Sequence, residues 1–152
     1  MTIEAKKYNA RMLFPKKVKH RKWQTGRKGP ERLARPDTRG TTIAFGAYGL
    51  RATSAGRITS NQIEAARKVI SRSTGKVGKS WIRIFPDRPF TAKPAEVGMG
   101  KGKGEPQGFI FETRPGRMLF ELDGVSESIA REAFRKAGAK LPVKTSFTKR
   151  EA

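Results

Sequence analysis

Two stretches of the chain repeat their apolar residues at helical spacing, and each carries the signals of a helix start and stop. Thr59 can cap the first turn of one helix while Gln62 bonds back to it, and Gly75 ends that helix. Ser126 caps the second helix, which ends at Gly138. The apolar stripes are Ile63, Ala66 and Ile70 in the first helix, and Ile129, Ala130, Ala133, Phe134 and Ala137 in the second. The pattern therefore predicts two amphipathic helices.

Shorter runs that are rich in β-branched and aromatic residues predict strands. They cover residues 41–45, 50–54, 81–85, 109–113, 118–122 and 143–148. Pro115 and Gly116 separate two of these runs and predict a hairpin. The proline-rich stretch over residues 86–94 predicts a connection without structure of its own. The period of the pattern assigns to the core Trp81, Phe85, Phe109, Phe111, Met118, Phe120, Ile129 and Phe134.

Strands and helices do not alternate strictly along the chain. The sequence therefore predicts an α+β fold, a single domain with a mostly antiparallel sheet and two helices. Residues 1–40 show neither period, and we interpret them as a basic, extended N-terminal arm. The predicted organisation is a basic N-terminal extension at 1–40, a globular domain at 41–148 and a short tail at 149–152.

Positive charge is concentrated in the first two thirds of the chain. The 152 residues hold 34 Lys+Arg and 13 Asp+Glu, a net charge of +21. Residues 1–40 carry a net +10 and residues 41–104 a net +9, whereas residues 105–152 carry only +2. Such an excess repels itself unless a polyanion surrounds it. Nucleic acid or an anionic membrane surface is therefore the expected partner.

The absence of cysteine excludes disulfides and thiolate metal sites, and it is compatible with a reducing compartment. No apolar run approaches the length of a membrane span, and residues 1–10 lack the apolar stretch of a secretory signal. These features predict a soluble, cytoplasmic protein, with an organelle as the alternative location.

The sequence offers little for catalysis. The one histidine, His20, lies among cations that disfavour an imidazolium, so a Ser/His/Asp triad is not expected, and zinc lacks ligands. Residues 78–80 end like a Walker A motif, but Ser73 stands where that motif needs glycine. Residues 98–104 carry Lys103 where a dinucleotide fingerprint needs glycine. We therefore predict that the protein is no enzyme and has no cofactor and no metal.

Binding to RNA explains the cations better, although each feature has a plainer interpretation. Trp23 either stacks on an unpaired base or docks on the protein's own body. Residues 98–104 either approach a phosphate backbone closely or form a flexible linker. Arg67, Lys68 and Arg72 either contact RNA or lie on a solvated helix face.

Several motifs occur in the order in which they occur in one ribosomal family. The motifs are Phe45-Gly46, Gly49-Leu50, residues 57–67, residues 78–87, residues 99–104, residues 123–134 and residues 140–145. Together they resemble the helices, the signature strand and the glycine–lysine loop of large-subunit ribosomal protein uL-sixteen. The resemblance runs in one register from about residue 12 to residue 148.

This resemblance implies an α/β-hammerhead type of domain in the large ribosomal subunit. It implies binding to 23S rRNA and contact with A-site transfer RNA through the basic arm and the glycine–lysine loop, with P-site transfer RNA and 5S rRNA as further candidate partners. No membrane partner is expected. The RNA-binding residues that we predict are Lys16, Lys17, Lys19, His20, Arg21, Lys22, Trp23, Arg27, Lys28, Arg67, Lys68, Arg72, Lys79, Arg83, Met99, Lys101 and Lys103.

The chain departs from the family pattern at three places. Gly98 stands where an arginine is usual, about ten residues precede the matching region, and residues 29–39 resemble an inserted loop. Two rival functions stay open on the sequence. An RNA-acting enzyme would need an acid cluster or a cofactor pocket, and a membrane binder would need a basic amphipathic helix with bulky apolar residues.

Overall fold

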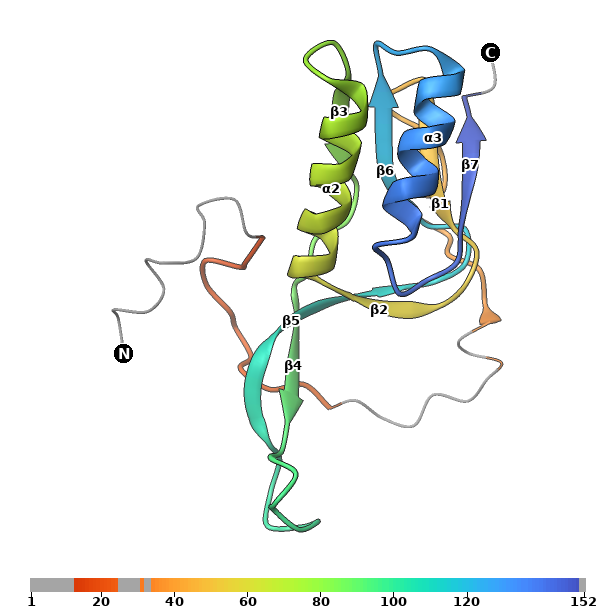
Figure 1. Cartoon of the computed structure of the whole chain (residues 1–152). Helices are drawn as coiled ribbons and strands as arrows, with labels where there is room; N and C mark the ends of the chain where they lie inside the picture. Colours follow the sequence, from red (N-terminus) through yellow and green to blue (C-terminus); the bar gives the residue numbers. More distant parts are fainter. Residues whose placement is uncertain (1–12, 25–30, 32–33, 151–152) are drawn as a thin grey trace.

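The computed structural model describes residues 13–24, 31 and 34–150. In this part of the chain the strands form two sheets, and every pair of neighbouring strands is antiparallel. The first sheet has the order β3 (Lys79–Ile82), β6 (Met118–Asp123), β1 (Tyr48–Ala52), β7 (Thr145–Lys149). The second has the order β2 (Gly56–Thr59), β5 (Glu105–Thr113), β4 (Arg88–Ala92). Helices α2 (Ser60–Thr74) and α3 (Glu127–Gly138) lie side by side on the first sheet (Figure 1). The predicted α+β fold is confirmed, but its strands divide between two sheets.

Both helices begin where their local signals predict. Thr59 Oγ1 accepts a hydrogen bond from the Gln62 backbone N–H at 3.5 Å, and the Gln62 side chain accepts one from the Thr59 N–H at 2.9 Å. This capping box satisfies two backbone donors that the first turn would otherwise leave free. Ser126 occupies the N-cap position of α3, but its hydroxyl bonds to the hydroxyl of Ser128 and not to the helix backbone.

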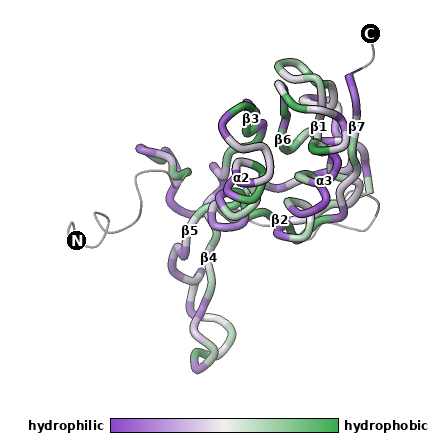
Figure 2. Tube along the Cα trace, turned by 45° about the horizontal axis from the view of Figure 1, so that its top comes forward, coloured by the Kyte–Doolittle hydropathy of each residue, from purple (hydrophilic) through white to green (hydrophobic). Residues whose placement is uncertain are grey.

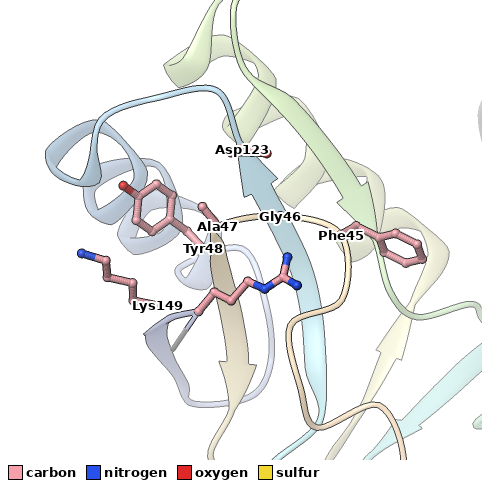
Figure 3. A pocket seen from close by; sticks show the side chains of 7 residues that line it. Phe45, Gly46, Ala47, Tyr48, Asp123 and Lys149 are labelled. Atoms are coloured by element: carbon pink, nitrogen blue, oxygen red, sulfur yellow. The ribbon is translucent and has the colours of Figure 1, made fainter. Parts of the chain in front are cut away.

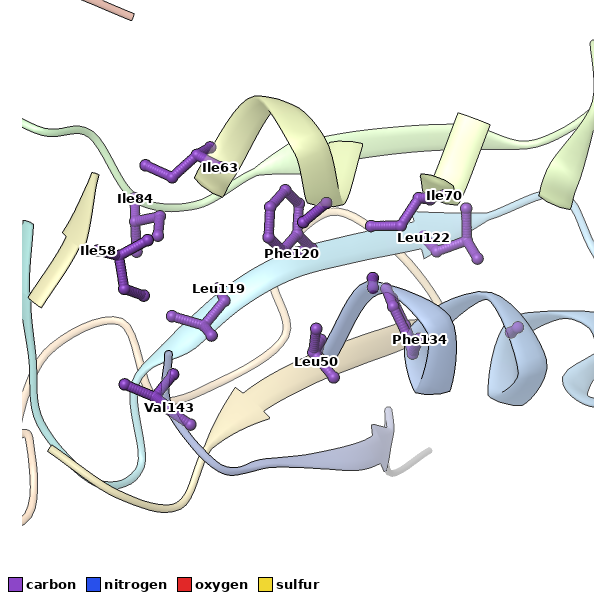
Figure 4. Close-up of a cluster of buried hydrophobic side chains, with 14 residues drawn as sticks. Leu50, Ile58, Ile63, Ile70, Ile84, Leu119, Phe120, Leu122, Phe134 and Val143 are labelled. Carbon is purple, nitrogen blue, oxygen red and sulfur yellow. The ribbon is translucent and has the colours of Figure 1, made fainter. Parts of the chain in front are cut away.

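The core lies between the two helices and the face of the first sheet that they cover (Figure 4). Its fully or almost fully buried large side chains are Leu50, Ile58, Ile63, Ile70, Leu119, Phe120, Leu122 and Phe134. The predicted apolar stripe of α2 is buried throughout. Burying one such side chain contributes about 1.5–3 kcal/mol. The contact between α2 and α3 therefore fixes the packing of this end of the molecule.

The turn at Pro115 and Gly116 does not join a hairpin, so that prediction is wrong. β5 pairs with β2 and β4, whereas β6 pairs with β1 and β3, and the turn carries the chain from one sheet to the other. Ala52, at the end of β1, explains why. Its carbonyl accepts from the Gly116 N–H at 2.7 Å and its N–H donates to the Arg117 carbonyl at 2.8 Å. The turn is thus held by a strand far away in sequence.

β4, residues 93–104 and β5 form a long projection that we call the finger. Figure 2 shows the finger standing clear of the end of the molecule that carries the helices. The sequence predicts a connection without structure over residues 86–94, but these residues contain β4, so that prediction is wrong. Pro89 is tolerated because β4 is an edge strand of its sheet. Pro106 lies beyond the part of β5 that pairs with β2, so its missing N–H leaves no partner unsatisfied on that side.

Residues 41–45 are not a strand, and Glu121 gives the reason. Its carboxylate, which has no solvent exposure, accepts hydrogen bonds from the backbone N–H groups of Ala44 at 3.1 Å, Phe45 at 2.6 Å and Gly46 at 2.9 Å. Arg83 also donates to it. The backbone N–H groups of Ala44 and Phe45 therefore bond to this carboxylate and not to a neighbouring strand.

Side chains of residues 81–85 alternate between two faces as predicted, but the face that meets the core is the opposite one. Ile84 is buried and Ile82 packs against the core, whereas Phe85 is 42% exposed and Trp81 is half-buried on the opposite face. Ile129 is also exposed, at 43%, because the stripe of α3 that meets the sheet runs through Ala130, Ala133 and Phe134. Phe109 is half-buried outside the core cluster. The core predictions for Trp81, Phe85, Phe109 and Ile129 are therefore wrong.

Replacing Glu121 with Gln should destabilise the fold strongly. The amide keeps the size of the side chain, but it leaves Arg83 without a buried partner and presents an N–H group to backbone donors. We expect a loss of about 3–5 kcal/mol in the free energy of unfolding, measured by urea denaturation. A glutamate of α3, Glu132, is exposed and bonded only to Lys136, so Glu132→Gln should change stability far less.

The effect should depend on pH. Burial alone would raise the pKa of Glu121, but its hydrogen bonds from the 44–46 backbone and from Arg83 outweigh burial and hold the pKa below its ordinary value. Such a carboxyl stabilises the fold above the unfolded-state pKa of about 4.3, and this contribution is lost as the pH falls through the folded-state pKa. The wild type and Glu121→Gln should thus differ most near neutral pH and converge in acid. Equal stability at neutral pH would contradict the role of this carboxylate.

Candidate nucleic-acid interface

Within the predicted N-terminal extension, residues 13–24 pack on the second sheet through two aromatic side chains. From here on, the arm means residues 13–24. Phe14 meets Phe109 of β5 edge-on, with ring centroids 6.4 Å apart and an interplanar angle of 69°. The Arg88 guanidinium of β4 lies over the ring of Trp23, 5.7 Å from its centroid. Of the two interpretations that the sequence left open for Trp23, the structure shows docking on the protein's own body, with 44% of the residue still exposed.

Polar contacts also join the arm to Lys103 and Glu105, where the loop of the finger meets β5. Lys22 Nζ lies 3.5 Å from the Glu105 carboxylate and donates to the Lys103 carbonyl at 3.3 Å. Arg21 lies 3.5 Å from the same carboxylate. Each of these exposed contacts contributes little by itself. Together with the aromatic contacts they place the basic run of the arm against the segment that carries Lys101 and Lys103.

The cations of this assembly are largely uncompensated. Among the described residues of the arm and of the loop at 93–104, the lysines that form no ion pair are Lys16, Lys17, Lys19, Lys93, Lys101 and Lys103. His20 is exposed next to them. Unpaired cations gathered on one surface attract a polyanion and release its counterions when it binds. The geometry therefore favours phosphate contacts.

The tip of the finger has a defined backbone shape. Gly100, Lys101 and Gly102 are consecutive residues with φ angles of 92°, 57° and 93°. Glycine adopts such angles freely, whereas a lysine there is uncommon. The Lys93 ammonium donates to the Gly100 carbonyl and supports the turn from inside. Met99 is 99% exposed beside it. The loop thus presents a lysine and an apolar side chain at its outermost point.

Gly98 is not required by the backbone. It is not among the glycines with positive φ, and a Cβ built on it meets no atom within 4 Å. An arginine, which the resembling family usually has here, would fit without disturbing the loop. The departure at Gly98 therefore removes a cation and does not reshape the finger.

The predicted residues on α2 and β3 fall into two groups. Glu64 accepts two hydrogen bonds from the Arg67 guanidinium, at 2.8 Å and 2.7 Å, and this hydrogen bonding raises the pKa of Arg67. Arg83 is bound to Glu121. The other group, Lys68, Arg72 and Lys79, is exposed and forms no ion pair within the described residues. Arg27 and Lys28 lie outside the residues that the structure describes.

A cavity of about 480 Å³ opens where the ends of β1, β6 and β7 meet residues 45–47 (Figure 3). Its charged lining residues are Asp123, Lys149 and Arg150. One acid beside two bases gives no pair of carboxylates and no activated nucleophile. Over residues 13–24, 31 and 34–150 no three His, Cys, Asp or Glu side chains are grouped as a metal site would need. No helix in that part of the chain has the length and apolar character to cross a bilayer.

A family model described as Ribosomal protein L16p/L10e matches residues 15–148. The chain belongs to this family. The match includes most of the arm, both sheets and both helices, so it covers the whole assembly described above. A protein of the L16p/L10e family is a structural constituent of the large ribosomal subunit, with a role in translation and with ribosomal RNA as its partner. Proteins of this family are typically structural and non-enzymatic.

The sequence missed the residues that hold this L16p/L10e protein's arm in place. Arg88, Glu105 and Phe109 receive the arm, and none of them carries a local signal for that role. Only the excess of cations pointed to this surface. Its internal organisation depends on contacts between distant parts of the chain.

Phe14→Ala should loosen the arm without unfolding the domain. An edge-to-face aromatic pair contributes about 0.5–1.5 kcal/mol, so opening of the arm should become roughly two- to tenfold more frequent. Limited trypsin digestion after Lys16, Lys17 and Lys19 measures this opening. Phe90→Leu, an exposed phenylalanine of β4 for which no arm contact is seen, is the control. If Phe14→Ala and wild type were cleaved at one rate, the docking of the arm would be disproved.

Proposed function

We propose that this ribosomal protein binds 23S rRNA and helps to organise the A site, where the arm and the finger contact transfer RNA. The observation that carries the proposal is the contact between arm and finger. It gathers unpaired lysines from two distant segments onto one surface. Neutralisation of phosphates by such cations supplies the largest part of sequence-independent affinity for RNA.

The chemistry of the finger suits backbone contact more than base recognition. Lys101 and Lys103 each offer a point charge on a long, flexible stem, which positions a phosphate without reading sequence. Gly100 and Gly102 lack side chains, so the backbone of an RNA strand can approach the loop closely. Met99 adds an apolar contact for a sugar or a base.

The rest of the proposed surface extends this contact to the body of the subunit. Lys16, Lys17, Lys19, His20 and Trp23 belong to the arm, and Lys68 and Arg72 lie on α2. We assign the α2 cations to 23S rRNA and the finger to transfer RNA. P-site transfer RNA and 5S rRNA are further proposed partners, and a cytoplasmic ribosome is the proposed location.

Binding to RNA should depend steeply on salt. If about six phosphates are neutralised, the logarithm of the association constant should fall against the logarithm of salt concentration with a slope of roughly −4 or steeper. Filter binding or fluorescence anisotropy with a fragment of large-subunit rRNA measures the slope. A slope near zero would show that the excess of cations does not drive binding.

Changing Lys101 and Lys103 together to Ala should leave the fold intact, since neither side chain packs in the core. Subunit assembly should persist because the arm and α2 carry other cations. Binding of transfer RNA to the A site of ribosomes that carry the variant should weaken by several fold. The matched control, Lys136→Ala with Lys140→Ala at the end of α3, removes the same charge elsewhere. Equal A-site binding by both double variants would remove the finger from the proposal.

A further inference from the structure

A second surface, on the first sheet, has a different character from the arm and finger. Phe45 stacks on Trp81 of β3 with ring centroids 6.2 Å apart and an interplanar angle of 20°. Lys79 Nζ lies 5.1 Å from the Trp81 ring centroid, and the Arg83 guanidinium lies 5.1 Å from the Phe45 centroid. We call these four residues the β3 stack. They form a row of two aromatic rings flanked by two cations.

The β3 stack lies on the face of the sheet that the helices do not cover. Trp81 is the cross-strand partner of Glu121, whereas Ile82 pairs with Phe120 on the core side. β3 is an edge strand at the end of the molecule that carries α2 and α3, away from the tip of the finger (Figure 1). Figure 3 shows the Phe45 ring directed across β3 and away from the other side chains that line the cavity.

Phe45 is exposed and yet firmly held. The residue is 58% exposed, so burial does not explain its position. Its backbone N–H and those of both neighbours bind the buried Glu121 carboxylate. Gly46 allows this close approach, because a Cβ there would lie 2.6 Å from the Leu122 carbonyl oxygen. A buried ionic anchor therefore holds the backbone of a solvent-exposed aromatic residue.

We propose that the β3 stack binds an unpaired base of ribosomal RNA, which packs against the solvent-exposed parts of the Phe45 and Trp81 rings. Every base has a π face, and single-stranded RNA binds to aromatic platforms flanked by cations. Lys79 is available for the adjoining phosphate, and Lys149 and Arg150 line the neighbouring cavity. Flanking cations fit an anionic strand better than the apolar face of a protein. The inference rests on the proposed function in one respect, that RNA is the partner.

The plainer interpretation is that Phe45 only covers Trp81. A cover of that kind would itself be buried or would shield its neighbour completely, but Trp81 stays half-buried and Phe45 keeps more than half of its surface in solvent. A ligand for the exposed ring better explains why a buried carboxylate anchors the backbone of this residue. Preorganisation of that kind reduces the entropy lost when the base binds.

Fluorescence of Trp81 tests the proposal on the full-length chain. Trp23→Phe leaves Trp81 as the only tryptophan, because the sequence has two. The probes are a short single-stranded oligoadenylate and an RNA duplex of the same length, and anisotropy of labelled RNA reports total binding. We expect the single strand to quench Trp81 and the duplex to bind without quenching. In the same background, Phe45→Leu should weaken binding of the single strand roughly fivefold or more and abolish most of the quenching.

Two further variants separate stacking from stability. Phe45→Tyr keeps the ring and should keep both quenching and affinity, whereas Ile129→Ala changes an exposed apolar side chain of α3 and should behave as the parent does. Single-stranded RNA that binds without quenching Trp81, or equal quenching by the duplex, would overturn the stacking inference and leave the proposed function standing. Failure of both RNAs to bind would overturn the proposed function and the inference together.

Discussion

The burial of one carboxylate decides how the first sheet is used. Glu121 lies in the middle of the sheet with no solvent exposure, where an ionised group is stable only if its charge is compensated and its oxygens are hydrogen-bonded. Three backbone N–H groups and Arg83 meet that requirement. The carboxylate thereby joins residues 44–46, β6 and the end of β3. The apolar core packs on one face of the sheet, and this polar cluster lies on the other.

The division into two sheets separates two kinds of surface. At the crossing between the sheets, Ala52 is bonded to both Gly116 and Arg117, so the finger projects from a rigid point. The second sheet carries the arm and the finger, whose exposed groups are mainly flexible cations. The first sheet carries the β3 stack, whose exposed group is a fixed ring. The two surfaces that we propose for RNA, one of charge and one of aromatic rings, thus lie at opposite ends of one small domain (Figure 1).

The sequence predicted what depends on neighbours in the chain. The capping box at Thr59 and the apolar stripe of α2 are local, and both are confirmed. Residues 41–45 have strand-forming side chains, but their backbone donors bind Glu121, which is more than seventy residues away. Phe85 was assigned to the core because alternation gives a period and not a face. Long-range partners also decided against the hairpin at Pro115.

The same limit applies to the candidate interface. Its lysines are visible in composition, whereas the order of the arm depends on contacts such as that between Lys22 and Lys103, which are 81 residues apart. These contacts have a consequence for affinity. A basic segment that is free in solution loses conformational entropy when RNA orders it, and part of the binding energy is spent on that ordering. Because Phe14 and Trp23 already hold the arm against the finger, less remains to be ordered. In the proposed complex, the aromatic contacts within the protein would therefore strengthen the binding of RNA by the arm.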